Sequence, residues 1–137
     1  MTTTIKTAKN GTRIYYVDGK RVSRDKAIET QANVRGANLF IVEYESSIKA
    51  CFVNGENKIY RSTRQGIVCK LETDIDEYHG FTVRAKLNGE SWFTVLRKFY
   101  SKVDAKALVA QIEDSYFAGE QGVRIHGDGT VEPLRQE

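Results

Sequence analysis

The most regular alternation of apolar and polar positions in the sequence lies between residues 81 and 97. The segment FTVRAKL has the period of a strand with one buried face, and Asn88-Gly89 follows it directly. This pair favours a type I′ turn, because both central residues of such a turn need positive φ. A two-residue hairpin would place Ala85 opposite Trp92. In that register the inward face consists of Phe81, Val83, Ala85, Leu87, Trp92 and Leu96.

A helical period follows over residues 101–119. Apolar residues three and four positions apart form one stripe, whereas Glu113 and Asp114 lie outside it. Ser101 with Asp104 three positions later has the spacing of a capping box. Such a helix must bury its stripe against a sheet, and the preceding hairpin is the nearest one. The stripe consists of Ala105, Leu108, Val109, Ile112 and Tyr116.

Turn signals divide the rest of the chain into short strands and one further helix. Asp18-Gly19 and Asn54–Asn57 are typical hairpin turns, and Ser46-Ser47 is expected to end the apolar strand LFIVEYE. Ser23 is a typical N-cap for a short helix. Thr73–Gly80 is expected to be an acidic connection.

These elements predict one domain of the α+β class, a meandering antiparallel β-sheet with one long C-terminal amphipathic helix and one short N-terminal helix. Its parts are a loose N-terminus (1–11), a hairpin plus short helix (12–36), an antiparallel sheet plus long helix (37–119), and a tail with one small hairpin about Gly127–Gly129 (120–137).

Composition narrows the picture only slightly. The chain has 137 residues, 40% of them hydrophobic, which is typical of a globular protein. Its net charge of +3, from 21 basic and 18 acidic residues, does not by itself indicate nucleic acid. Cys51 and Cys69 lie in strand-like runs and are expected to be buried free thiols of a reducing compartment. Without an apolar leader or spanning segment, we expect a cytoplasmic protein with no membrane partner.

No pattern of catalytic residues is present in the sequence. His79 lies near Asp74, Asp76 and Glu77, but this loop lacks the ligand spacing that rigid metal sites use. Neither a GxSxG elbow nor a GxxxxGK[ST] phosphate loop occurs. We therefore expect no enzymatic activity, no metal and no cofactor.

The outer face of the 81–97 hairpin is the main candidate binding surface. It combines cations that neutralise phosphates, an aromatic ring that stacks on bases, and hydroxyl groups that donate to backbone oxygens. Such a face predicts a non-enzymatic binding protein for anionic nucleic acid or a nucleotide. Its candidate nucleic-acid-binding residues are Thr82, Arg84, Lys86, Ser91, Phe93 and Arg97.

The order strand FTVRAKL, Asn-Gly turn, strand SWFTVLRKF and helix resembles the sheet-plus-helix DNA-binding unit of ethylene-response-factor and integrase arm-type domains. The resemblance covers residues 65–118, with Gln65–Glu72 as the first strand. It implies DNA contacts by the sheet-face residues Arg84, Lys86, Phe93 and Arg97. Two departures stand against it: Arg97-Lys98-Phe99 replaces the expected GxF step, and Thr73–Gly80 is acidic.

A second hypothesis concerns protein or nucleotide partners. Small aromatic-rich proteins without catalytic motifs are common among phage or mobile-element accessory proteins, which inhibit a host defence protein or sequester a nucleotide signal. Tyr and Arg dominate such interfaces. Homo-oligomerisation through an exposed strand edge is a further alternative. The residues of this alternative surface are Tyr15, Tyr16, Tyr60, Arg61, Arg64 and Arg124.

Overall fold

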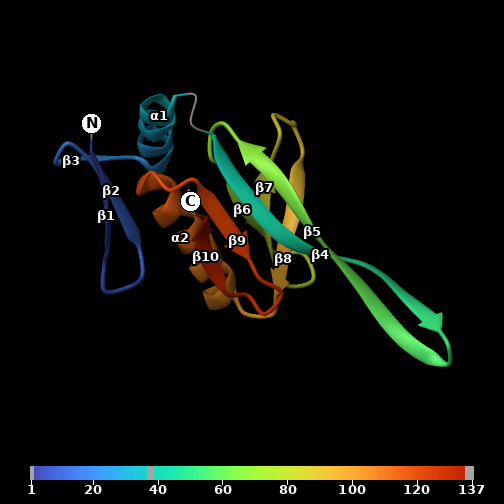
Figure 1. Ribbon diagram of the computed structural model, residues 1–137. Helices are drawn as coiled ribbons and strands as arrows, with labels where there is room; N and C mark the ends of the chain where they lie inside the picture. Colours follow the sequence, from blue (N-terminus) through green and yellow to red (C-terminus); the bar gives the residue numbers. More distant parts are fainter. Residues whose placement is uncertain (1, 37–38, 135–137) are drawn as a thin grey trace.

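The computed structural model describes residues 2–36 and 39–134, except for the side chains of residues 46–51 and 59–61. Over these residues the chain forms two helices and ten strands, which confirms the α+β class (Figure 1). The strands belong to three sheets, with the orders β1-β2-β3, β10-β9-β4-β5 and β6-β7-β8. The elements are β1 (Thr3–Thr7), β2 (Arg13–Val17), β3 (Lys20–Val22), α1 (Arg24–Arg35), β4 (Phe40–Val53), β5 (Glu56–Val68), β6 (Thr73–Asp76), β7 (Phe81–Lys86), β8 (Phe93–Phe99), α2 (Lys102–Phe117), β9 (Gly122–Ile125) and β10 (Val131–Leu134).

The first sheet includes a strand that the sequence pattern did not predict. Residues 1–11 were expected to be loose, but Thr3–Thr7 pairs antiparallel with β2. This strand is mostly polar and lies at a sheet edge, so its order comes from the backbone ladder rather than from burial. The amide of Thr2 also donates to the side chain of Asp18 over 2.9 Å.

Helix α1 begins where the sequence predicted. The Oγ of Ser23 accepts a hydrogen bond of 3.1 Å from the amide of Lys26, which satisfies one of the first-turn donors. The helix continues to Arg35, whose guanidinium is buried and donates to the carbonyl oxygen of Tyr116 in α2 over 3.0 Å. This contact joins the two helices.

Strands β4 and β5 form one long hairpin that extends well beyond the rest of the molecule (Figure 1). The expected turn at Ser46-Ser47 is absent. β4 runs through that position with a β-bulge between Ser47 and Lys49, and the chain reverses at Asn54-Gly55, where both residues have positive φ. The expected strand Gln65–Glu72 is likewise only the end of one long strand, β5, which begins at Glu56 and ends at Val68.

The predicted C-terminal hairpin is present, but its pairing with the rest of the sheet departs from the expected antiparallel meander. β9 and β10 are antiparallel to each other, while β9 also runs parallel to Ile41–Tyr44 of β4. Gly122 makes this close approach possible, because a Cβ there would lie 2.1 Å from the carbonyl oxygen of Ile41. The parallel pair follows from the crossover through α2.

The third sheet contains the Asn88-Gly89 turn, with φ values of 58° and 71°, but not the predicted register. Ala85 faces Thr94 instead of Trp92, which is 62% exposed rather than part of the core. Asn88 explains the shift: its amide donates to the carbonyl oxygen of Ile67 over 2.7 Å, and its Oδ1 accepts from the Ile67 amide. The turn is therefore docked on β5 and leaves a longer loop before β8.

Part of the expected acidic connection is also a strand. β6 pairs antiparallel with β7, so that Asp74 faces Arg84 and Asp76 faces Thr82. This pairing brings carboxylates next to the cations of β7.

Helix α2 lies in the centre of the molecule and contacts both later sheets and the N-terminal unit. The residues of its apolar stripe are buried, apart from the half-buried Val109. The sequence pattern placed Glu113 outside this stripe, yet Glu113 is only 1% exposed. It is buried because β2 and α1 cover the side of α2 that faces away from the sheet.

Candidate functional site

The outer face of β7 and β8 brings two of the predicted cations around one aromatic ring. The guanidinium carbon of Arg84 lies 4.8 Å from the centroid of Phe93, and the Nζ of Lys86 lies 5.2 Å from it. Thr82 shares this face, because it alternates with Val83 and Ala85, which are buried on the other side. Four of the six predicted residues therefore come together.

The other two are elsewhere. Ser91 is exposed in the loop before β8. Val83 faces Arg97 but the next residue, Arg84, faces Val95, because a β-bulge lies between the two pairs. Arg97 therefore lies on the same side of the sheet as the buried Val83. On that side the β9–β10 turn approaches it, since a Cβ at Gly129 would lie 3.5 Å from its Nε. The expectation that Arg97 belongs to the outer face is wrong.

Arg84 and Lys86 on the outer face are paired with carboxylates, whereas Lys98, which faces Thr82 in the ladder, is exposed. Arg84 donates to both oxygens of Asp74, over 2.8 and 2.5 Å, and also lies 3.7 Å from Asp76. Lys86 lies 3.1 Å from Glu72. The hydrogen bond from Arg84 to Asp74 is the main reason that the pKa of Arg84 is raised. The two cations around Phe93 are therefore already compensated, and only Lys98 among the described cations of this face has no carboxylate partner.

The four residues of the alternative surface whose side chains are described are spread over three strands, β2, β5 and β9. Tyr15 is buried. On the same strand, the ring centroid of Tyr16 lies 5.3 Å from the Nζ of Lys6. Arg124 in β9 donates to Glu43 over 2.7 Å, and this bond raises its pKa. Arg64 is exposed on β5. The side chains of Tyr60 and Arg61 lie outside the described residues.

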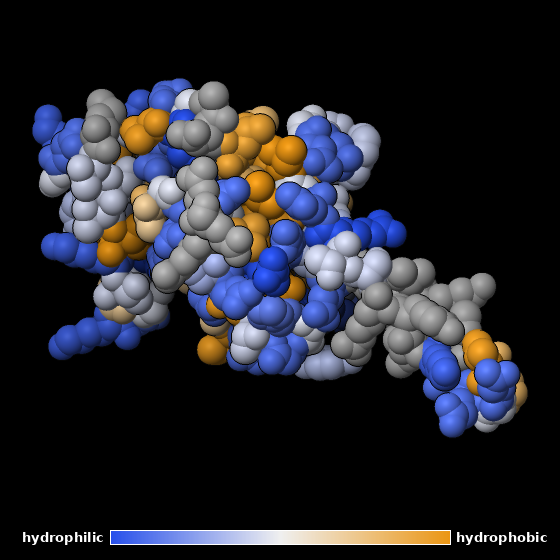
Figure 2. All heavy atoms as spheres, viewed as in Figure 1, coloured by the Kyte–Doolittle hydropathy of each residue, from blue (hydrophilic) through white to orange (hydrophobic). Residues whose placement is uncertain are grey.

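The projecting end of the β4–β5 hairpin is a surface that the sequence patterns did not single out. We call residues 46–62 the arm. Between Ile41 and Tyr44 β4 pairs with β9, whereas along the arm β4 and β5 pair with each other. At the tip, Phe52 is 73% exposed and Lys58 is exposed as well. Figure 2 shows hydrophobic and hydrophilic surface side by side at the far end of this hairpin. The alternation and the Asn54-Gly55 turn indicated a hairpin here, but no local pattern showed that it leaves the body.

The arm also carries most of the net charge. It contains three basic residues, Lys49, Lys58 and Arg61, and one acidic residue, Glu56. Its net charge is therefore +2, out of +3 for the whole chain. The arm combines a narrow shape, positive charge and an exposed aromatic side chain.

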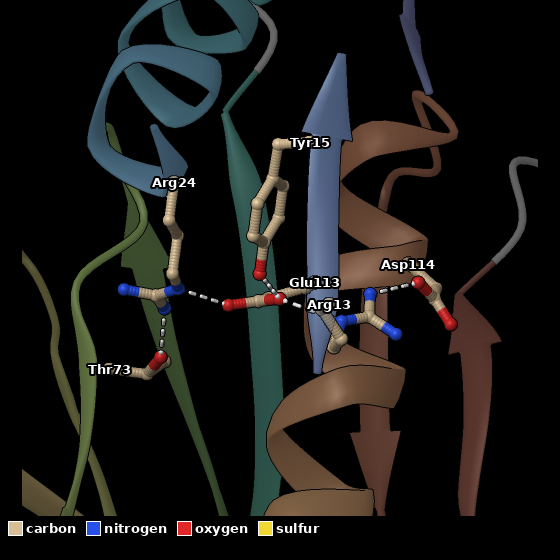
Figure 3. A network of polar contacts seen from close by, with 6 residues as sticks. All are labelled: Arg13, Tyr15, Arg24, Thr73, Glu113 and Asp114. Carbon is tan, nitrogen blue, oxygen red and sulfur yellow. Dashed lines mark hydrogen bonds and ion pairs between the residues drawn. The ribbon is translucent and has the colours of Figure 1, made fainter. Parts of the chain in front are cut away.

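A buried polar network joins the N-terminal unit to α2 (Figure 3). The Glu113 carboxylate accepts hydrogen bonds from the Tyr15 hydroxyl, over 2.7 Å, and from the Nε of Arg24. Arg13 lies 3.4 Å from the same carboxylate and donates to the exposed Asp114 over 2.5 Å. Because every group has an opposite charge or a donor beside it, this cluster is suited to holding elements together.

Among the side chains that the structure describes, no three His, Cys, Asp or Glu residues are grouped as a metal ion would require. His79 packs against the ring of Tyr78, with the ring centroids 4.1 Å apart. Cys69 is exposed rather than buried, which corrects that expectation, and the side chain of Cys51 is not described. Neither α1 nor α2 has the length and apolar composition of a membrane-spanning helix.

Comparison of the chain with protein-family models, with curated proteins and with solved structures finds no match.

Proposed function

We propose that this protein is a non-enzymatic binding protein for duplex DNA and that the arm, rather than the outer face of β7 and β8, enters the groove. The observation that carries the proposal is the projecting, positively charged hairpin with Phe52 exposed at its end. A two-stranded β-ribbon fits the major groove of B-DNA, which is about 12 Å wide. The deep major groove of duplex RNA is too narrow for side-chain readout, which favours DNA.

The charge distribution supports the arm over the sheet face. Arg84 and Lys86 already have carboxylate partners, so a phosphate would have to displace Asp74 and Glu72. Among the described side chains of the arm, Lys58 has no carboxylate within salt-bridge distance. A free cation releases DNA counterions on binding without losing a protein partner, which makes its contribution to affinity larger.

The length of the arm is sufficient for this role. From Ser46 to Val53, β4 contributes eight residues, and at about 3.3 Å per residue the arm spans about 26 Å. The major groove is about 8.5 Å deep, so the tip can reach base edges while the base of the arm remains at the phosphates. An exposed Phe at the tip of a DNA-binding element can contact a thymine methyl group or wedge between base steps.

The test is fluorescence anisotropy of a labelled mixed-sequence duplex titrated with the full chain at several salt concentrations. If each arm cation contacts one phosphate, the plot of log affinity against log salt has a slope of about −3. Lys58→Ala should weaken binding and reduce the slope by about one. Phe52→Ala should weaken binding without changing the slope, because the aromatic ring releases no counterion.

The matched control is Arg84→Gln, which removes one cation from the sheet face. It should leave duplex affinity unchanged if the arm binds DNA. Loss of binding in Arg84→Gln together with normal binding in Lys58→Ala would move the site back to the sheet. No binding of wild-type protein at low salt would overturn DNA binding and favour a protein partner for the arm.

A further inference from the structure

A cavity of about 570 Å³ lies where the end of β8, the beginning of α2 and the β9–β10 turn meet. It is distant in sequence from the arm and independent of the proposed DNA contact. Its volume is in the range of about 300–1,000 Å³ that is typical of small-molecule sites. The charged and polar residues that line it include Arg97, Lys98, Tyr100, Ser101, Asp104 and Asp128.

Arg97 is the most unusual member of this lining. The β-bulge in β8 turns it to the helix side of the sheet, where its Nε is buried and has no acceptor. Among the arginines whose side chains the structure describes, the other half-buried or buried ones each donate to a carboxylate or carbonyl oxygen, as Arg24 and Arg35 do. The guanidinium of Arg97 lies over the ring of Phe99, with its central carbon 5.5 Å from the ring centroid, and has no carboxylate partner among the described residues. Its N–H groups can therefore donate to an anion.

The beginning of α2 adds further donors on the same side. Ser101 is the N-cap, but its side chain makes no capping hydrogen bond. The Ser101 hydroxyl and the first-turn amides of α2 are therefore not bonded to each other. Backbone amides at the beginning of a helix favour an anion. Here they accompany Arg97 rather than form a site by themselves.

The remaining lining favours a ligand with more than a phosphate. Tyr100 is 93% exposed at the edge of the cavity, which leaves its ring free to stack on a planar base. Asp104 and Asp128 are carboxylates, which repel a bare anion but accept hydrogen bonds from sugar hydroxyls. Hydrogen bonds from Thr130 hold the pKa of Asp128 below its usual value, so it is ionised at neutral pH.

We propose that this cavity binds a nucleoside monophosphate, with Arg97 at the phosphate, Tyr100 on the base and a carboxylate at the ribose. The cavity then provides a small-ligand site separate from the DNA-binding arm. Each of the three parts of the ligand has a chemically matched group within one lining.

The test is isothermal titration calorimetry of the full chain with adenosine monophosphate, adenosine and inorganic phosphate as probes. Adenosine monophosphate should bind at least about tenfold more tightly than either fragment, because only it engages both ends of the cavity. Arg97→Gln should lower this affinity by about tenfold or more. Arg84→Gln, which removes a cation that is already paired, is the matched control and should bind as the wild type does.

Tyr100→Ala is a second variant. It should fold as the wild type does, because the side chain of Tyr100 is almost fully exposed. It should lower the affinity for adenosine monophosphate by about tenfold and leave the affinity for phosphate unchanged. Absence of binding by the wild type, or equal affinity in Arg97→Gln, would overturn the proposal. If Arg97→Gln does not fold, undiminished nucleotide affinity in Tyr100→Ala would overturn it instead.

Discussion

The hydroxyl of Tyr15 donates a hydrogen bond of 2.7 Å to the carboxylate of Glu113, which is buried in the middle of α2. Tyr15 comes from β2, and Arg24 at the start of α1 donates to the other carboxylate oxygen. One acidic side chain thus joins the first sheet and the first helix to the rest of the fold (Figure 3). Glu113 is therefore a structural residue, and its removal should lower the stability of the whole fold.

We expect Glu113→Ala to lower the free energy of unfolding by about 2–4 kcal/mol, because it leaves Tyr15 and two arginines without their shared acceptor. Urea denaturation followed by circular dichroism measures this loss. The control is Asp114→Ala, which removes an exposed carboxylate bonded to Arg13 and should cost less than about 1 kcal/mol. Similar losses in the two variants would show that Glu113 is not the central acceptor.

The same contact predicts how stability depends on alkaline pH. Burial, followed by the hydrogen bond and charge of Glu113, raises the pKa of Tyr15 in the folded state. The folded protein therefore holds the phenolic proton more tightly than the unfolded chain does. This contribution to stability is complete below the unfolded value of about 10 and is lost as pH rises through the higher folded pKa.

Chemical denaturation between neutral and strongly alkaline pH checks this expectation. The free energy of unfolding should fall above about pH 10, and the fall should be shallower in Tyr15→Phe, which has no proton to lose. Burial also raises the pKa of Tyr116, so part of the slope should remain. A slope that Tyr15→Phe leaves unchanged would contradict the prediction.

Two glycines allow a graded test of close packing. A Cβ at Gly122 would lie 2.1 Å from the backbone oxygen of Ile41, whereas a Cβ at Gly66 would lie 2.6 Å from the terminal methyl of Leu87. A backbone oxygen in a strand ladder cannot move aside, but a leucine side chain can adjust. Gly122→Ala should therefore cost more than about 3 kcal/mol and Gly66→Ala about 1–3 kcal/mol. Thermal and urea unfolding measure the two losses of stability. A larger loss in Gly66→Ala than in Gly122→Ala would contradict this reasoning.

The arm should be dispensable for folding. Replacing residues 47–61 by Asn-Gly would join Ser46 to Ser62, which already face each other in the ladder. The core residues of these strands, among them Phe40, Tyr44 and Val68, all lie outside the replaced segment. We expect the free energy of unfolding to change by less than about 1 kcal/mol, because the replaced turn closes the same strand pair. Loss of a cooperative urea transition would show instead that the arm packs on the body.

Several features of this fold were predictable because they depend on neighbouring residues. Asn88-Gly89 and Asp18-Gly19 adopt the positive φ values that their residue types favour, and Ser23 caps α1. The stripe of α2 from Ala105 to Tyr116 is buried because a 3.6-residue period places these side chains on one face. The candidate cluster of Arg84, Lys86 and Phe93 followed from strand alternation in the same way.

Other features depended on pairings between distant segments. The β-bulge that moves Arg97 to the helix side, and the docking of Asn88 on β5, have no local signature in residues 81–97. The ion pair between Arg84 and Asp74 depends on the pairing of β6 with β7, and the sequence pattern predicted an acidic loop in place of β6.

The sequence by itself determined the α+β class, the positions of the tight turns and the residues that α2 buries against the sheet, because each follows from the periods and backbone preferences of contiguous residues. Only the tertiary structure decided that Glu113 is buried, that Arg84 is paired with Asp74 and that Arg97 lies against Phe99 without a carboxylate partner. These outcomes depend on which strand lies next to which and on what covers the outer side of α2, and residues far apart in the chain set both.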